Sequence, residues 1–244
     1  MTPTVRVCRD AAALVEAAAS LLAESCAEAV RARGRFHLAL SGGSTPRALY
    51  ARLASGSVRP PVPWSQIEWW WGDERHVPPD DSQSNYRMAA EALLNHVPID
   101  PRRVHRMKGE DPDAAHAARA YERDLVTVFG LAAGERPRID VVLLGLGPDG
   151  HTASLFPGTA AVAERDRLVV ANDVPAMRTT RLTMTLLVLN AARLVVFLVS
   201  GAEKAPILGR VLAGRDDLPA RRVQPSDGEL IWLVDDAAAR GLAT

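Results

Sequence analysis

The sequence has few of the features that mark a secreted, disulfide-rich or nucleic-acid-binding protein. Only two of its 244 residues are cysteines, Cys8 and Cys26, and they form neither a C-x-x-C pair nor a metal-ligand cluster. This scarcity argues against a disulfide scaffold and favours a reducing compartment. Neither sign of charge is in excess, since Lys plus Arg and Asp plus Glu both number 29. No overall field therefore favours nucleic acid or an anionic membrane, and any anionic ligand needs a local site.

Long hydrophobic runs are also missing. The N-terminus has no basic region followed by an apolar core, and the alanine-rich segment after it carries glutamates, so no signal peptide is expected. The most apolar region, LTMTLLVLNAARLVVFLVSG at residues 182–201, contains Arg193. It breaks into two shorter pieces that suit buried strands joined by a helical turn. We therefore expect a cytoplasmic protein that contacts neither membranes nor nucleic acid.

What the chain has instead is an alternation of short apolar runs and amphipathic, alanine-rich stretches. Several runs are continuous in Val, Ile, Leu and Trp, which is typical of strands covered on both faces. We predict strands at residues 4–8, 36–40, 67–71, 140–145, 168–171, 182–186, 194–199 and 230–234. We predict helices at about residues 11–32, 46–54, 85–95, 113–129 and 203–213. No linker or repeat divides the chain, so residues 1–244 are expected to form one α/β domain, a doubly wound, mostly parallel sheet flanked by helices.

Polar residues before the predicted helices are candidate caps. Asp10 is placed to cap the first helix, Ser44 or Thr45 the second, and Asp111 the fourth. The polar residues 82–85 are expected to cap the helix that follows them, which is a purely structural role.

Ligands of a doubly wound sheet bind beyond the carboxyl ends of its strands, so the loops that follow strands are the candidate sites. The first is LALSGGSTPRAL at residues 38–49, where a strand ends in a turn of two glycines and three hydroxyl residues before a helix begins. Glycines let backbone N–H groups approach an anion, and a helix N-terminus adds unpaired donors. The loop lacks the G-K-[ST] ending of a nucleoside triphosphate site. We interpret it as a phosphate site; the alternative is a plain strand–turn–helix corner.

The second loop, WWWGDERHVPPDDSQSNYRMA, begins with three tryptophans that read as a buried strand. Asp73, Glu74, Arg75 and His76 follow at its carboxyl end. Charged groups placed there must be solvated, paired with one another or turned toward a cleft. A salt-bridge cluster that only fixes the loop and a catalytic role both remain open.

The third loop, VVLLGLGPDGHTASLFPG at residues 141–158, contains the G-x-G-x-x-G spacing of a dinucleotide-binding turn. That turn must lead into a helix long enough to aim its dipole at a pyrophosphate, but Pro157 and Gly158 leave only a short segment. A dinucleotide site is therefore not expected. His151 remains, on a tight loop after a strand, as a group that can accept and return a proton near neutral pH. Among the other histidines only His76 is a rival base.

Five segments of the chain, taken together, match one known family. In chain order they are LSGGSTP, WGDERHVPPDDSQSNYRMA, LLGLGPDGHTASLFPG, RLTMTLLVLNAA and LVSGAEKA, between about residues 36 and 234. They resemble the 6-phosphogluconolactonase family, within the wider glucosamine-6-phosphate deaminase/isomerase superfamily. The ending TASLFPG after the histidine is the lactonase form, whereas the deaminases typically carry an Ile-Ala-Phe-Asn-Glu type of sequence there.

The resemblance implies hydrolysis of 6-phosphoglucono-1,5-lactone to 6-phosphogluconate, with no metal or organic cofactor. It implies that His151 activates water and that Arg75 lies at the reacting end, with Asp73 in support. The residues implied to hold the substrate phosphate are Ser41, Gly42, Gly43, Ser44, Thr45 and Lys204. Arg181 is implied on the ligand side, and the N–H group of Gly147 is a candidate donor to the oxyanion. The expected partner is a phosphorylated sugar lactone, and the protein is expected to be a monomer or a small homo-oligomer.

Two other functions remain open. A sugar-phosphate deaminase or isomerase could use the same scaffold. A non-catalytic sugar-phosphate sensor would need the phosphate loop but no water-activating histidine. Sensors usually carry a DNA-binding segment, and we expect no room for one before the first predicted strand.

Overall fold

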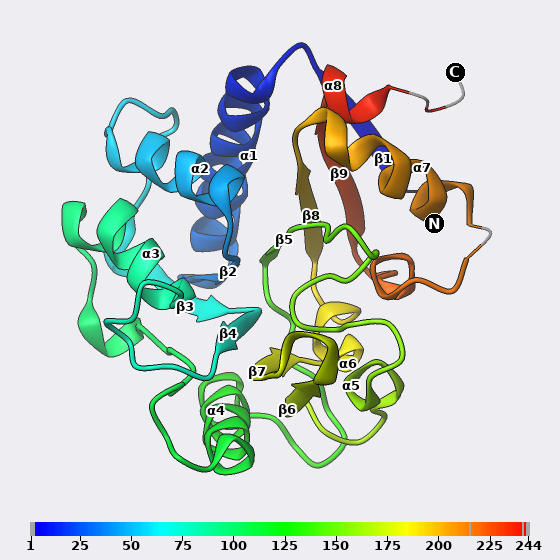
Figure 1. The fold of residues 1–244 in the computed structure, drawn as a ribbon. Helices are drawn as coiled ribbons and strands as arrows, with labels where there is room; N and C mark the ends of the chain where they lie inside the picture. Colours follow the sequence, from blue (N-terminus) through cyan, green and yellow to red (C-terminus); the bar gives the residue numbers. More distant parts are fainter. Residues whose placement is uncertain (1–2, 215, 241, 243–244) are drawn as a thin grey trace.

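Six parallel strands form the main sheet of the computed structural model, which describes residues 3–214, 216–240 and 242. Across the sheet the order is β1-β9-β8-β5-β2-β3 (Figure 1). The strands are β1 (Thr4–Cys8), β2 (Phe36–Leu40), β3 (Ile67–Trp71), β5 (Val141–Leu144), β8 (Leu194–Val199) and β9 (Glu229–Asp235). The predicted doubly wound α/β class, with its mostly parallel sheet, is confirmed.

A second, three-stranded antiparallel sheet lies beside the main one. It has the order β4-β7-β6 and consists of β4 (Asp73–Arg75), β6 (Val169–Val174) and β7 (Thr179–Met184). The sequence did not predict β4, because three consecutive charged residues do not resemble a strand. The strand predicted at residues 182–186 corresponds to β7, which begins and ends earlier. The short helix α6 (Leu186–Leu189) begins where the strand was expected to end.

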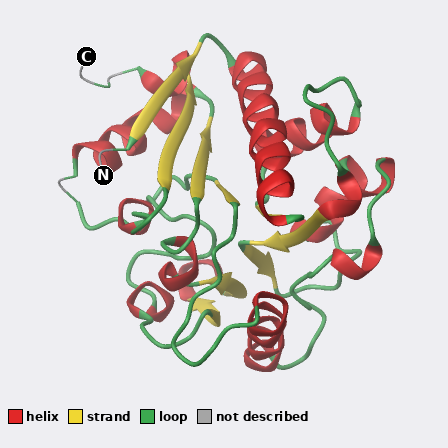
Figure 2. Ribbon diagram, turned by 180° about the vertical axis from the view of Figure 1, so that it is seen from behind, coloured by secondary structure: helices red, strands yellow, loops and turns green. Residues whose placement is uncertain are grey.

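Helices cover both faces of the main sheet, and the long α1 runs along it (Figure 2). The longer helices are α1 (Ala11–Arg33), α2 (Ser44–Ala54), α3 (Asn85–Ala92), α4 (Ala114–Phe129) and α7 (Ala205–Ala213), and the short ones are α5 (Ala160–Ala163) and α8 (Asp236–Ala239). Successive residues of a strand point to opposite faces. Trp69 and Trp71 accordingly pack in the core with α1, α2 and α3, whereas Trp70 packs in the core with α4 and α7. Burial of β3 on both faces explains why three consecutive tryptophans occur in it.

The helix caps were predicted in part. Asp10 caps α1 as expected, accepting a hydrogen bond of 2.7 Å from Ala13 N. The prediction for α2 was wrong, because this helix begins at Ser44 directly after a glycine and has no side-chain cap. The prediction for α4 was also wrong, because Asp113 and not Asp111 caps it.

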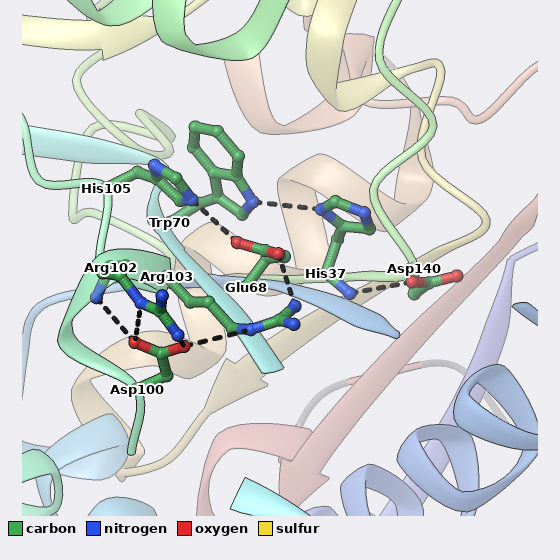
Figure 3. Close-up of polar contacts among 8 residues, drawn as sticks. All are labelled: His37, Glu68, Trp70, Asp100, Arg102, Arg103, His105 and Asp140. Carbon is green, nitrogen blue, oxygen red and sulfur yellow. Dashed lines mark hydrogen bonds and ion pairs between the residues drawn. The ribbon is translucent and has the colours of Figure 1, made fainter. Parts of the chain in front are cut away.

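A cluster of buried polar side chains lies at the amino ends of β2, β3 and β5, the end of the sheet away from the predicted loops (Figure 3). Glu68 accepts hydrogen bonds from His105 Nε2 at 2.8 Å and Arg103 Nη1 at 2.7 Å. Burial opposes ionisation of Glu68, but these two partners outweigh it and lower its pKa. His37 is 7% exposed, and its Nδ1 accepts a hydrogen bond of 3.3 Å from Trp70 Nε1. The cluster satisfies the polar groups that begin these strands.

The buried His37 makes the fold sensitive to acid. Burial lowers its pKa from 6.5 to about 4 because it disfavours the imidazolium. Between these two pH values the unfolded chain binds a proton that the folded chain does not, so stability falls as the pH drops through this window, by about 3 kcal/mol in total. Urea unfolding of His37→Asn should show a smaller loss between neutral pH and pH about 4 than the unsubstituted protein. The exposed His96→Asn is the control, and equal losses in all three proteins would contradict this role.

Within the described part of the chain, no helix has both the length and the apolar character needed to cross a membrane.

Candidate active site

A cavity of about 460 Å³ opens at the carboxyl ends of the parallel strands. The segments that follow β2, β3, β5 and β8 supply most of its walls, and the small antiparallel sheet supplies the rest. Every site residue predicted from the sequence lines it, namely Ser41, Gly42, Gly43, Ser44, Thr45, Asp73, Arg75, Gly147, His151, Arg181 and Lys204. The volume lies in the range usual for small-molecule sites.

One side of the cavity is the N-terminus of α2. Gly43, with φ of +110°, precedes the helix and provides no side-chain cap, so the first N–H groups of α2 have no capping side chain. Ser41 Oγ is buried and makes no hydrogen bond within the described residues. The backbone N and O of Ser41 are both bonded to the Tyr50 hydroxyl at 2.9 Å, which fixes the turn. Unpaired N–H donors at a helix N-terminus beside a free hydroxyl suit an anion.

Three cations also line the cavity. Arg75 and Arg181 lie directly opposite each other on β4 and β7. Neither arginine forms an ion pair with any described residue, and burial together with the neighbouring Arg75 lowers the pKa of Arg181. Lys204 follows β8, and its Nζ donates a hydrogen bond of 2.9 Å to Leu146 O. Cations held close together without acidic partners of their own favour an anionic ligand.

His151 forms a pair with Asp149. Its Nδ1 lies 2.5 Å from Asp149 Oδ1, which also accepts a hydrogen bond of 3.1 Å from His151 N. Partial burial opposes ionisation of Asp149, but the hydrogen bonds from His151 outweigh it and lower the pKa of this carboxyl group. An ionised carboxylate only accepts hydrogen bonds, which assigns the proton of the neutral imidazole to Nδ1 and leaves Nε2 as the acceptor. Asp149 was not predicted as a site residue from the sequence, although its position two residues before the histidine was a usable signal.

The glycines around His151 make room for its ring. A Cβ atom on Gly147 would lie 2.1 Å from the imidazole of His151, and Gly150 has φ of +83°. The prediction that the N–H group of Gly147 donates to the oxyanion was wrong, because this N–H already donates to His151 O at 2.9 Å. Residues 151–159, all of them described, contain no helix, and α5 beyond them has four residues. The G-x-G-x-x-G spacing therefore supports an imidazole and offers no helix for a dinucleotide.

The sequence left two interpretations open for the charged loop after β3, a cluster that only fixes the loop and a role in the site. Each applies to some of its residues. Glu74 is 2% exposed and accepts hydrogen bonds from two backbone N–H groups in the first turn of α3 and from the serine hydroxyl that caps this helix. It fixes the loop. His76 does not line the cavity, and its Nε2 lies 2.5 Å from Asp111 O. Asp73 and Arg75 do line the cavity, so half of the loop is structural and half faces the site.

In the described residues, no three His, Cys, Asp or Glu side chains group in a way that could hold a metal ion. The cavity presents donors and cations together with one paired imidazole. A doubly wound α/β fold with this cavity at its carboxyl edge is typical of proteins that bind small ligands, and the cations in the cavity favour an anionic one. Residues 9–232 match the family model described as glucosamine-6-phosphate isomerases/6-phosphogluconolactonase, and the chain belongs to this family.

Individual relatives agree with this assignment. The chain is 44% identical over 246 residues to the 6-phosphogluconolactonase of Nostoc sp., with 100% of both chains covered. It is 43% identical to the 6-phosphogluconolactonase of Synechocystis sp., with 99% of both covered. Among solved structures, the 6-phosphogluconolactonase from Trypanosoma brucei superposes with a TM-score of 0.88 at 33% identity, with 99% of both chains covered. The resemblance inferred from the loop motifs is confirmed.

Proposed function

We propose that this protein hydrolyses 6-phospho-D-glucono-1,5-lactone to 6-phospho-D-gluconate, a step of the oxidative pentose phosphate pathway. The observation that carries the proposal is the Asp149–His151 pair, which leaves Nε2 of the imidazole as a base in a cavity that three cations and the N-terminus of α2 also line. The names of the relatives support the choice of substrate.

His151 acts as the general base. Its Nε2 takes a proton from a water molecule as the water oxygen bonds to C1 of the lactone, and Asp149 stabilises the imidazolium that forms. The tetrahedral intermediate then collapses, the bond from C1 to the ring oxygen breaks, and the imidazolium returns the proton to that oxygen. Acid–base help of this kind contributes about 10²–10⁴-fold. No covalent intermediate is needed, because a δ-lactone is an activated ester that water opens unaided.

Arg75 stabilises the negative charge that develops on the carbonyl oxygen bonded to C1. Its guanidinium lies on β4 in the same cavity as His151 and has no acidic partner among the described residues. A preformed cation aimed at the developing oxyanion lowers the barrier without reorganisation. Asp73 supports the site through its hydrogen bonds with Ser154 and Asn85. Arg181, opposite Arg75 on β7, contributes from the ligand side.

The phosphate is held at the other end of the substrate. The residues that bind it are Ser41, Gly42, Gly43, Ser44, Thr45 and Lys204. Their binding energy is remote from the reacting atoms, so its effect is to hold C1 against the imidazole.

Replacing Lys204 with alanine should raise KM by roughly tenfold or more with little change in kcat, because a charged contact to the phosphate is lost while the reacting groups stay in place. Steady-state kinetics measure both constants. Lys108→Ala is the matched control, since Lys108 is the only other lysine and is exposed away from the cavity. An unchanged KM for Lys204→Ala would remove this residue from the phosphate site.

A coupled assay with freshly generated 6-phosphogluconolactone, corrected for spontaneous opening, tests the proposed function directly. We expect 6-phosphogluconate to form at a rate that rises in proportion to enzyme concentration. Ammonia release or aldose–ketose conversion from glucosamine 6-phosphate, without lactone hydrolysis, would assign the protein to the other branch of its family. Binding of sugar phosphates without turnover of either substrate would indicate a sensor.

A further inference from the structure

Ser154 joins the His151 loop to the small antiparallel sheet. It lies in the irregular segment after β5, is 2% exposed, and uses its side chain and both backbone groups. Its Oγ donates a hydrogen bond of 2.6 Å to Asp73 Oδ2 on β4, and its N donates one of 3.3 Å to Thr183 Oγ1 on β7. Its carbonyl accepts a hydrogen bond of 2.9 Å from Asn172 Nδ2 on β6. One residue therefore attaches this loop to all three strands of that sheet.

The same contacts continue to the N-terminus of α2. Asn85 Nδ2 donates to Asp73 O at 3.0 Å and lies 3.4 Å from Asp73 Oδ1. The amide of Asn85 packs against Gly42, where an added Cβ would lie 2.0 Å from Asn85 Oδ1. A chain of direct contacts thus runs from Gly42 through Asn85 and Asp73 to Ser154. It connects the wall that binds the phosphate to the segment that carries His151.

In this series of contacts, the hydrogen bond from Ser154 Oγ to Asp73 is the one that joins β4 to the His151 loop. Asp73 is 8% exposed, so water has little access to the carboxylate oxygen that Ser154 satisfies. A short hydrogen bond between a hydroxyl group and a buried carboxylate is charge-assisted and directional. Loss of the hydroxyl would leave the Asp73 oxygen short of a donor and the loop without its side-chain attachment to β4.

We propose that Ser154 is a positioning residue for the hydrolysis of the lactone. Its bond to Asp73 sets the distance between the His151 imidazole and the carbonyl carbon of a substrate whose phosphate is held at α2. Ser154 acts through Asp73 and does not touch the reacting atoms. This inference rests on the proposed function.

The test is the kinetics of Ser154→Ala, which deletes one hydroxyl group. We expect kcat to fall by about tenfold to a hundredfold, because a misplacement near 1 Å has an effect of this size, while KM and the affinity for 6-phosphogluconate stay within about threefold. Thr180→Ala is the matched control. Thr180 Oγ1 donates a hydrogen bond of 2.7 Å to Asp173 Oδ1 on the same sheet, but Thr180 does not line the cavity. This control should keep both constants within about twofold.

Asp73→Asn, alone and combined with Ser154→Ala, completes a double-mutant cycle. If Ser154 acts through Asp73, the loss of kcat in the double variant should be clearly smaller than the product of the two single losses. Thermal unfolding and circular dichroism establish that each variant is folded at the assay temperature.

Wild-type kcat in folded Ser154→Ala would overturn the inference, and so would fully multiplicative effects in the cycle. A smaller fraction of folded Ser154→Ala, with unchanged kcat per folded molecule, would show that Ser154 contributes to stability alone. None of these results would touch the proposed function, which instead fails if the unsubstituted protein does not hydrolyse the lactone.

Discussion

Replacing His151 with asparagine should lower kcat by at least about a hundredfold while KM stays within about threefold. Asparagine has no group that takes a proton from water near neutral pH, but its amide can occupy the place of Nδ1 beside Asp149. The proposed phosphate-binding wall consists of the start of α2 and Lys204 and does not include the imidazole. The substitution thus removes proton transfer and leaves binding, which is the pattern expected of a general base.

His76→Asn is the control for this experiment. His76 lies in the charged loop after β3 but does not line the cavity, and its Nε2 is engaged by Asp111 O. We expect this variant to keep most of its turnover. Near-normal turnover in His151→Asn, or a collapse of kcat in His76→Asn, would contradict the assignment and make His76 the base.

The second large effect is expected from Gly147→Ala, which adds one methyl group. The new Cβ would lie 2.1 Å from the His151 imidazole, a distance that forces the ring to move. Because the ring moves off Asp149 and away from C1, kcat should fall by about a hundredfold or more, with a smaller change in KM. Steady-state kinetics measure both, and thermal unfolding reports whether the fold is retained.

Gly209→Ala makes the same chemical change where nothing is crowded. Gly209 lies in α7, and a Cβ there would have no neighbour within 4 Å. This control should keep wild-type kcat and gain slightly in stability, since alanine favours a helix over glycine by about 1 kcal/mol. Wild-type turnover in Gly147→Ala would mean that the position of the imidazole does not limit the reaction.

Much of the fold could be predicted from the sequence because the main sheet is buried on both faces. Strands such as β5 and β8 are short, continuous apolar runs bounded by polar or turn residues, and a run of this kind has few alternatives. β4 could not be found in this way. Its residues are charged, and it is a strand only because β7 supplies its hydrogen bonds. Pairing between distant segments leaves no local pattern, so the division into two sheets was missed as well.

The site was easier to find than its supporting contacts. Glycines, hydroxyl groups and a histidine placed directly after predicted strands converge because the carboxyl ends of parallel strands share one edge. Asp149 lies only two residues before His151 and could have been found from this spacing. Ser154 could not, because its side-chain partner lies far away in the chain. The partner of Ser154 Oγ is Asp73, which is 81 positions away in the chain. The uncapped start of α2 was also unexpected, since a serine near a helix start usually caps it.

A crystal structure with bound 6-phosphogluconate tests the central claim most directly. We expect the phosphate on the N–H groups at the start of α2 and on Lys204, with a carboxylate oxygen of C1 within hydrogen-bond distance of His151 Nε2. The reverse orientation, with the phosphate beside His151 and the carboxylate at α2, would contradict the account, and so would a ligand bound outside the cavity.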